Sequence, residues 1–266
     1  VASDTLEIPN PPGAVIDAHA HIGRWFNFFI PDPTPDSMVE VMDRCGVQLA
    51  VVSALLGVGP DAAAGNREVV DLVSRRPDRF AGYAVFNPHH RGSSRDVDEA
   101  LSRPGMVGIK IHPVTHAYAV DGSQYADAFR LADRHGVPVL SHSEGGTATC
   151  DPLQFAAIAA RWPRVPVILG HAGISDEGHR RALAVAAAHP NLYLELCGSS
   201  STGRWLRRFV EELGAERVLY GSDFPFIDMR YILGRVLYAG LDADDQAAIL
   251  GRNAATLLRL PAIGDR

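Results

Sequence analysis

The chain contains little cysteine and no apolar stretch long enough to cross a membrane. Its three cysteines, Cys45, Cys150 and Cys197, are scattered, and so few thiols predict neither a disulfide framework nor a thiolate metal site. No run of about 18 apolar residues occurs, and the first residues do not combine a basic segment with an apolar one, so neither a membrane span nor a secretory signal is expected. We therefore expect a reducing, cytoplasmic location.

Strong positive charge and glycine-rich phosphate loops are also missing. The 266 residues carry a net charge of −6, which argues against nucleic acid or an anionic membrane as the main partner. Neither G-x-G-x-x-G nor G-x-x-x-x-G-K follows a predicted strand, so dinucleotide-binding and P-loop folds have no phosphate cradle here. With 47% hydrophobic residues the chain can bury a sizeable core. Because nucleic acid and membrane are not favoured, a small molecule is the expected partner.

Short apolar runs alternate with helical patterns along the chain. Eight runs rich in β-branched residues predict strands at residues 14–19, 48–54, 80–86, 106–112, 137–142, 165–171, 191–196 and 217–223. Amphipathic stretches predict helices at residues 36–45, 61–75, 93–102, 124–135, 152–162, 177–189 and 202–213, and two more follow the last strand. Thr34 and Pro35 suit the start of the first helix, and glycines lie where helices end, at Gly46, Gly136 and Gly214.

Eight strand–helix units predict a single (β/α)₈ TIM barrel. Strands that alternate with helices pair in parallel through right-handed crossovers, and eight such units favour a closed barrel over an open sheet. A chain of 266 residues has the usual size of such a barrel. No linker or shift in composition divides the chain, so residues 1–266 are expected to form one domain.

Metal-binding residue types lie at the carboxyl ends of these predicted strands. In V-I-D-A-H-A-H-I-G, alternation puts His19 and His21 on one face of the first strand, within reach of the same ion. Residues at the carboxyl ends of barrel strands converge on one mouth. That rule brings to the same mouth Asn87, His89, Lys110, His112, His142, His171 and Asp223. The alternative is a set of structural histidines, which would have no reason to favour strand ends.

Five segments, taken in order, resemble the amidohydrolase superfamily: I-D-A-H-A-H-I-G, G-I-K-I-H-P, V-L-S-H-S, I-L-G-H-A-G and L-Y-G-S-D-F-P. The closing A-I-L-G-R-N-A-A-T-L-L-R-L is similar to that family's C-terminal helix, so the resemblance runs from about residue 14 to residue 260. It points to the branch that includes amidohydrolase-related hydrolases and nonoxidative decarboxylases. It indicates little about the substrate.

The resemblance implies a metal centre with a small set of catalytic groups. Asp223 would also accept a proton from metal-bound water, and His171 would contact substrate or act as an acid or base. Lys110 matches a carboxylated lysine that bridges two metals in binuclear members, or it would orient a substrate carboxylate if unmodified. One Zn²⁺ is expected, with Mn²⁺ or a second ion as alternatives, because first-row divalent ions accept these donors. The implied metal ligands are His19, His21, His142 and Asp223.

Such a centre suits hydrolysis on physical grounds. Three neutral imidazoles and one carboxylate leave Zn²⁺ with positive charge and an open coordination position. This lowers the pKa of bound water from about 15.7 to about 7, which is worth roughly 12 kcal/mol towards hydroxide. The sequence therefore favours a metal-dependent hydrolase that attacks an amide, lactone or ester carbonyl of a small organic acid. The alternatives are a decarboxylase of an aromatic or unsaturated carboxylate, which would use the same ligands, and a non-catalytic ligand-binding barrel.

Loop residues near the predicted mouth are candidates for substrate contact. Arg24 and Trp25 follow the first strand directly and are suited to clamp a carboxylate and to cover an apolar substrate. Asn87 and His112 are further candidates. The phenylalanines after Trp25 pack either that loop or an oligomer contact such as a homodimer, namely Phe26, Phe28 and Phe29.

Two acids and six histidines have roles that depend on where they point. Asp17 either orients a ligand or forms a polar layer of the barrel, and Glu195, on a face with Tyr193 and Cys197, either belongs to the site or is structural. His89 and His116 lie in loops at the mouth, where they contact either substrate or the loop itself. The others are expected in loops or on the surface, at His90 and His135, or facing solvent on helices, at His179 and His189.

Overall fold

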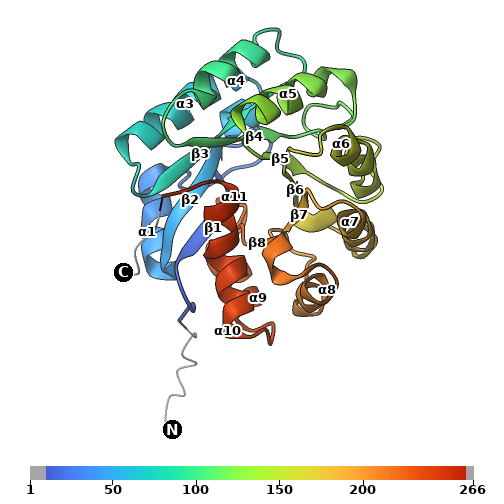
Figure 1. Ribbon diagram of the computed structural model, residues 1–266. Coiled ribbons are helices and arrows are strands. Elements are labelled where there is room, and N and C mark those ends of the chain that lie inside the picture. The colour runs from blue at the N-terminus through green and yellow to red at the C-terminus, as the bar shows by residue number, and fades with distance from the viewer. Residues whose placement is uncertain (1–9, 262–266) are drawn as a thin grey trace.

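Eight parallel strands form a barrel with helices around it (Figure 1). The computed structural model describes residues 10–261. Each strand pairs in parallel with the next one in the chain, which confirms the (β/α)₈ TIM barrel. The strands are β1 (Val15–Ile22), β2 (Val47–Ala54), β3 (Phe80–Val85), β4 (Met106–Ile111), β5 (Val139–His142), β6 (Val167–Gly170), β7 (Leu192–Glu195) and β8 (Val218–Leu219).

The helices mostly follow the predicted pattern. Thr34 caps α1, where its hydroxyl accepts a hydrogen bond from the Ser37 amide at 3.2 Å, and Gly46 ends that helix with φ of 70°. The short α2 directly after β2 is not among the predicted helices. The helices are α1 (Pro35–Cys45), α2 (Leu55–Val58), α3 (Ala62–Arg75), α4 (Ser93–Leu101), α5 (Ala126–His135), α6 (Phe155–Arg161), α7 (Asp176–Ala188), α8 (Gly203–Leu213), α9 (Met229–Leu237), α10 (Ala243–Ala247) and α11 (Asn253–Leu257).

The first and last strands differ most from their predicted extents. β1 runs on to Ile22, so it includes both histidines of the H-A-H sequence. β8 has only two residues, and the predicted strand over residues 217–223 is wrong in its length. The chain leaves the extended conformation before Asp223, which has φ of 62°, and the Tyr220 amide donates to the Ile249 carbonyl instead of to a strand.

Backbone hydrogen bonds and one buried acid join β1 to the segment after β8. The Ala18 amide donates to the Tyr220 carbonyl at 3.0 Å, and the Asp223 amide donates to the His19 carbonyl at 2.8 Å. The Asp17 carboxylate is fully buried and accepts from the amides of Ser222 at 2.9 Å and His19 at 3.1 Å, and from the Ser222 hydroxyl. Burial raises the pKa of Asp17 to about 7, although the Ser222 hydrogen bonds oppose this shift. Asp17 thus holds together the two backbone segments that carry His19 and Asp223.

Apolar side chains fill the barrel and surround it. Inside, Ile16, Val51 and Leu219 pack together, and the Tyr83 hydroxyl donates to the Ala18 carbonyl at 2.9 Å. Ala254 of α11 packs against this interior cluster, and α11 lies in front of the strands in Figure 1. A larger apolar layer lies between the strands and the outer helices. One end of the barrel is therefore closed by apolar packing, and polar side chains are left for the other end.

The structure bears on two expectations about location. Within residues 10–261, none of the helices combines the length and apolar composition that a membrane-spanning helix requires. Most of the N-terminal stretch in which no secretory signal is expected, residues 1–9, lies outside the described residues.

His179 and His116 are both buried. His179 is expected to face solvent, and this expectation is wrong, because its ring packs between α7 and α8 with its centroid 5.3 Å from that of Trp205. Its Nδ1 donates to the Ala172 carbonyl at 2.7 Å. His116 is 4% exposed, and its Nδ1 lies 2.7 Å from the Tyr125 hydroxyl. His189 is partly exposed.

Burial of His116 predicts that the protein loses stability in mild acid. Removal from water lowers its pKa from 6.5 to about 4, so between these values the unfolded chain binds a proton that the folded chain does not. The free energy of unfolding therefore falls as the pH drops, by about 2 kcal/mol between pH 7 and pH 5 from this residue alone. Urea unfolding of the wild type and of His116→Gln at both pH values measures it. Equal losses of stability in the two proteins would contradict the assignment.

Candidate metal centre

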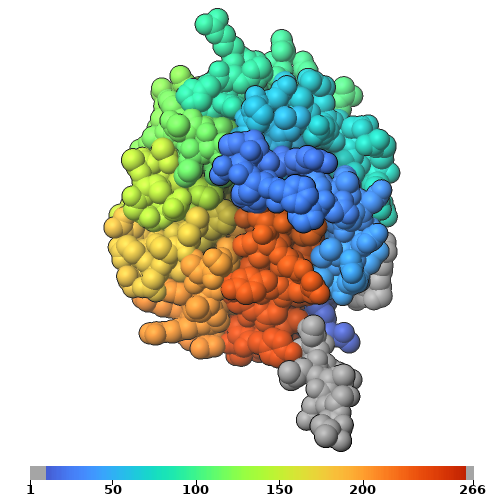
Figure 2. Space-filling view, turned by 180° about the vertical axis from the view of Figure 1, so that it is seen from behind, coloured from blue at the N-terminus to red at the C-terminus, as the bar shows by residue number. Residues whose placement is uncertain are grey.

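The carboxyl ends of the strands gather a set of histidines and acids around one cavity. Its volume is about 170 Å³, and its lining combines polar residues with apolar ones. Figure 2 shows the mouth face, where the loop after β1 lies beside the segment that follows β8. The polar lining residues are His21, Lys110, His112, His142, His171 and Asp223. The apolar lining residues are Trp25, Leu55, Val58 and Phe226.

The two histidines of β1 are held with the same edge toward Asp223. The Nδ1 of His19 donates to Glu195 Oε2 at 2.8 Å, and the Nδ1 of His21 lies 2.8 Å from the Ser53 hydroxyl. Their Nε2 atoms lie 3.7 Å and 3.1 Å from Asp223 Oδ1. A histidine whose Nδ1 is fixed by an oxygen and whose Nε2 faces a carboxylate has the arrangement of a metal ligand.

His142 shows that this end of the barrel suits a metal ion. It is 9% exposed, and neither of its ring nitrogens has a hydrogen-bond partner among residues 10–261. The nearest carboxylate oxygen, Glu144 Oε2, is 3.6 Å from Nε2, which is too far for a hydrogen bond. A buried imidazole without a partner is costly, and a metal ion is a partner that such a nitrogen accepts. The donors present therefore fit a divalent ion.

One group of possible ligand atoms includes a cysteine. One ligand atom from each of four residues lies within 4.8 Å of the others, and these residues are His19, His171, Cys197 and Asp223. Cys197 is fully buried, and the expectation that no thiol belongs to a metal site stays a prediction. This group shares His19 and Asp223 with the ligand set that the resemblance implies. His21 lies against Asp223, and the His142 ring centroid is 4.6 Å from that of His171.

Lys110 lies against one of these nitrogens. Its side chain is 1% exposed, and Nζ is 2.7 Å from His19 Nε2. Burial lowers the pKa of Lys110, and the nearby Asp223 carboxylate opposes this effect. The position is compatible with both predicted roles, as a bridging group and as a group that orients substrate.

Charges in the cavity match what metal binding requires. Burial alone would raise the pKa of Asp223, but the hydrogen bond from His21 and the proximity of His171 and His19 outweigh it and lower that pKa. Burial, reinforced by His142, lowers the pKa of His171 well below its usual value. A carboxylate that stays ionised and imidazoles that stay neutral are the forms that bind metal ions.

Not every predicted substrate residue reaches the cavity. Trp25 and His112 line it, whereas Arg24 is exposed and is not part of the lining. Asn87 also stays outside, because its side-chain oxygen accepts a hydrogen bond from the His89 amide at 2.9 Å. His89 itself supports its loop, since Nε2 donates to the His116 carbonyl at 2.7 Å.

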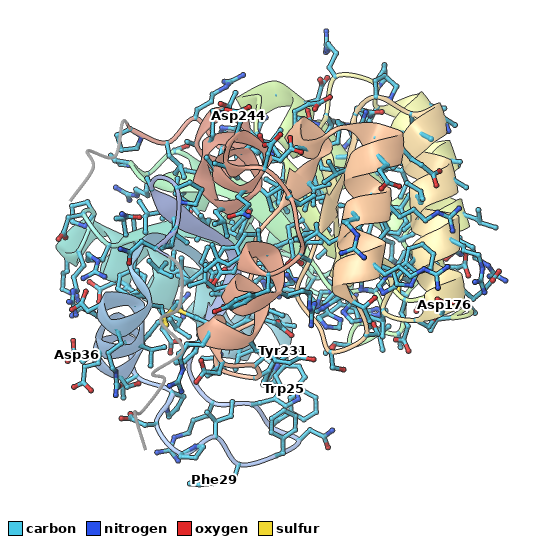
Figure 3. All side chains as sticks on the ribbon, turned by 90° about the horizontal axis from the view of Figure 1, so that it is seen from below. Trp25, Phe29, Asp36, Asp176, Tyr231 and Asp244 are labelled. Carbon is cyan, nitrogen blue, oxygen red and sulfur yellow. The ribbon has the colours of Figure 1, made fainter. Side chains whose placement is uncertain are left out.

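The phenylalanines after Trp25 lie in an exposed loop. Phe26, Phe28 and Phe29 are 67%, 51% and 78% exposed, and Figure 3 shows Phe29 at the outer edge of this loop. Phe28 has its ring centroid 5.3 Å from that of Phe226, so it packs at the mouth. The homodimer stays a prediction.

Sequence reasoning did not find several groups at the site. Phe226 lines the cavity three residues after Asp223, and its ring centroid is 5.6 Å from that of Trp25. Ser53 fixes His21 from the neighbouring strand β2. A polar residue at the end of a barrel strand is the signal that would have pointed to Ser53.

Comparison with known proteins decides the family. Residues 16–260 match the family model described as amidohydrolase. The chain belongs to the amidohydrolase family. This membership confirms the resemblance seen in the sequence, and it makes the barrel mouth the expected place for catalysis in this enzyme.

Its relatives include both hydrolytic and decarboxylating enzymes. The amidohydrolase chain is 25% identical over 241 residues to L-fucono-1,5-lactonase of Burkholderia ambifaria, covering 79% of this chain and 80% of that protein. It is 23% identical over 254 residues to γ-resorcylate decarboxylase of Rhodococcus jostii, covering 75% and 76%. A crystal structure of dihydroxybenzoic acid decarboxylase from Polaromonas, with bound manganese and an inhibitor, has the same fold, with a TM-score of 0.74, 18% identity, and coverage of 93% of this chain and 97% of that one.

Proposed function

We propose that this protein is a metal-dependent, nonoxidative decarboxylase of a small aromatic or unsaturated carboxylate. The observation that carries the proposal is the aromatic and apolar lining of the cavity that also contains the metal-binding residues. Trp25 and Phe226 stand beside Leu55 and Val58 in a volume of about 170 Å³. An apolar cavity of about 150 Å³ holds a benzene ring, so this space suits one ring with its carboxylate.

The lining changes the preference drawn from the sequence. The predicted ligands suggest hydrolysis first, but decarboxylation would use the same ligands. The rest of the cavity therefore has to discriminate between the two reactions. Flat aromatic side chains favour a planar substrate, because ring pairs gain about 0.5–1.5 kcal/mol beyond the burial of area. The decarboxylases of resorcylate and dihydroxybenzoate among the relatives support the same choice.

The residues of this chain have separate tasks in the proposed reaction. A divalent ion held by His19, His21, His142 and Asp223 would supply positive charge that binds the substrate carboxylate. Trp25 and Phe226 contact the ring, and Lys110 is placed to attract a carboxylate oxygen. The carbon–carbon bond to the carboxylate breaks, carbon dioxide leaves, and a proton takes its place on carbon. His171 lines the cavity and would relay that proton from solvent to carbon.

Hydrolysis remains the second candidate because of one relative and one side chain. L-fucono-1,5-lactonase matches the chain over most of its length. Asp223 lines the cavity as an ionised carboxylate, and it would act as the proton acceptor that attack by water needs.

The two reactions differ in what they release and incorporate. We suggest incubating protein loaded with Zn²⁺ or Mn²⁺ with a panel of hydroxybenzoates, unsaturated acids and lactones in ¹⁸O-labelled water. Carbon dioxide release that is faster than in the metal-free control supports decarboxylation. Acid that carries ¹⁸O without carbon dioxide would establish hydrolysis and reject the proposal. A metal-loaded, folded protein that turns over nothing in the panel would favour a non-catalytic barrel.

Removal of the aromatic lining is expected to weaken binding of an aromatic substrate. Trp25→Ala and Phe226→Leu should each raise KM about tenfold, which corresponds to about 1.4 kcal/mol of lost ring contact. Phe29→Ala is the matched control, because this ring belongs to the same loop but is 78% exposed. Steady-state kinetics of the three variants measure the difference. A similar KM for Trp25→Ala and Phe29→Ala would contradict a role of Trp25 in substrate contact.

A further inference from the structure

A buried carboxylate outside the cavity contacts two of the histidines at the site. Glu195, at the end of β7, is fully buried. Its Oε2 accepts hydrogen bonds from His19 Nδ1 at 2.8 Å, from the His171 amide at 3.1 Å and from the Cys197 thiol at 2.9 Å. Its Oε1 accepts from the Cys197 amide at 2.5 Å. These four donors oppose the effect of burial, which raises the pKa of Glu195 above its usual value.

Cys197 connects this carboxylate to His171. Its sulfur lies 3.0 Å from His171 Nδ1. A thiol has one proton, and Cys197 directs that proton to Glu195, so the sulfur accepts a hydrogen bond from Nδ1 of His171. His171 therefore carries its proton on Nδ1, and its Nε2 has a free lone pair.

Contacts on both sides of the His19 ring favour the same tautomer. The Glu195 carboxylate only accepts hydrogen bonds, so the Nδ1 of His19 must donate to it. The Lys110 side chain, when protonated, only donates, and it lies 2.7 Å from Nε2 of His19. Both contacts leave that Nε2 without a proton.

We propose that Glu195 and Cys197 are positioning residues that fix the tautomers of His19 and His171, so that both rings offer an unprotonated Nε2 to the metal centre. In water a neutral histidine side chain favours the proton on Nε2, which is the form that cannot bind a metal through that atom. The network reverses this preference before any metal arrives. The inference holds for either reaction, because it concerns the tautomers of the two histidines and not the substrate.

Nuclear magnetic resonance of the metal-free protein reports the tautomers directly. Long-range ¹H–¹⁵N spectra separate a histidine protonated on Nδ1 from one protonated on Nε2. We expect both His19 and His171 to carry the proton on Nδ1 in the wild type. Cys197→Ala should move the proton of His171 towards Nε2. His19, whose Nδ1 lies 3.3 Å from the same sulfur, should keep its proton on Nδ1 because Glu195 still accepts from it. Cys150→Ala, which removes another fully buried thiol, is the matched control and should change neither histidine.

Glu195→Gln tests the carboxylate. The glutamine NH2 group would replace either Oε1, which faces the Cys197 amide, or Oε2, which faces His19 Nδ1, the His171 amide and the Cys197 thiol, so at least one buried hydrogen bond becomes a donor–donor contact. Groups that orient a metal ligand typically contribute about 10–100-fold to metal affinity. We expect this loss for Zn²⁺, measured by competition with a chelator, together with a shift of His19 towards the Nε2 tautomer.

Two results would overturn the inference. The first is a wild-type spectrum in which either histidine carries its proton on Nε2. The second is an unchanged His171 in Cys197→Ala, which decides the matter even if Glu195→Gln does not fold. Because the probes are Zn²⁺ and the histidine spectra, a protein that releases no carbon dioxide can still support this inference while it refutes the proposed reaction.

Discussion

Asp223→Asn is expected to lower kcat by about 10²–10⁴-fold on any substrate that the protein turns over. Asparagine keeps the shape of the side chain but cannot accept a proton, and it removes the negative charge beside His21. That charge lies 3.1 Å from His21 Nε2 and faces the cavity. The lower pKa of Asp223 means that the wild-type carboxylate stays ionised at neutral pH, so the variant loses a charge that is present at working conditions. Steady-state kinetics together with elemental analysis of bound metal measure the effect.

Asp228→Asn provides the matched control for this variant. Asp228 follows five residues later and caps α9, where its carboxylate accepts a hydrogen bond from the Arg230 amide at 2.9 Å. Asparagine caps a helix about as well as aspartate, so this variant should keep both activity and stability. Retention of most of the wild-type kcat by Asp223→Asn would remove Asp223 from the catalytic machinery.

Replacement of His19 and His142 together by alanine is expected to abolish metal binding in a protein that still folds. Two nitrogen donors disappear, and one of them, in His142, has no other partner among residues 10–261. The loss of affinity should exceed the roughly 10–100-fold that outer groups contribute. Elemental analysis after dialysis measures bound metal, and circular dichroism checks the fold.

His116→Ala is the control for this double variant, because it removes a buried histidine that does not line the cavity. It should bind metal as the wild type does. Full metal content in the double variant would reject the predicted ligand set. If Cys197→Ser loses metal while the double variant keeps it, the thiol-containing group of His171, Cys197 and Asp223 is the centre.

Strand order explains why so much of the mouth could be predicted from the sequence. In a closed parallel barrel, the carboxyl ends of all strands lie at the same mouth. Lys110, His142 and His171 therefore reach the same cavity although no local pattern connects them. The extent of β8 could not be predicted in this way. Its apolar run ends at Tyr220, two residues before Ser222, and the left-handed backbone at Asp223 depends on contacts with β1.

Side-chain direction explains what the sequence left open. Glu195 could face the site or the structure around it, and its contacts with His19 become visible only when β1 and β7 are placed in space. Cys197 lies beyond the end of β7, where strand alternation no longer predicts direction. His179 is expected to face solvent, but α7 buries its polar ring against α8. Arg24 and Asn87 belong to loops, whose paths do not follow from periodicity.

The hydrogen bonds of Asp17 across the junction of β1 and β8 have a consequence for synthesis of the chain. They join residues 205 positions apart in sequence, and His19 and Asp223 come together only when this junction forms. A nascent chain released before residue 218 would have its early histidines but no carboxylate to complete the set. The chain is therefore expected to bind metal late in folding, only after its last strand has docked against β1.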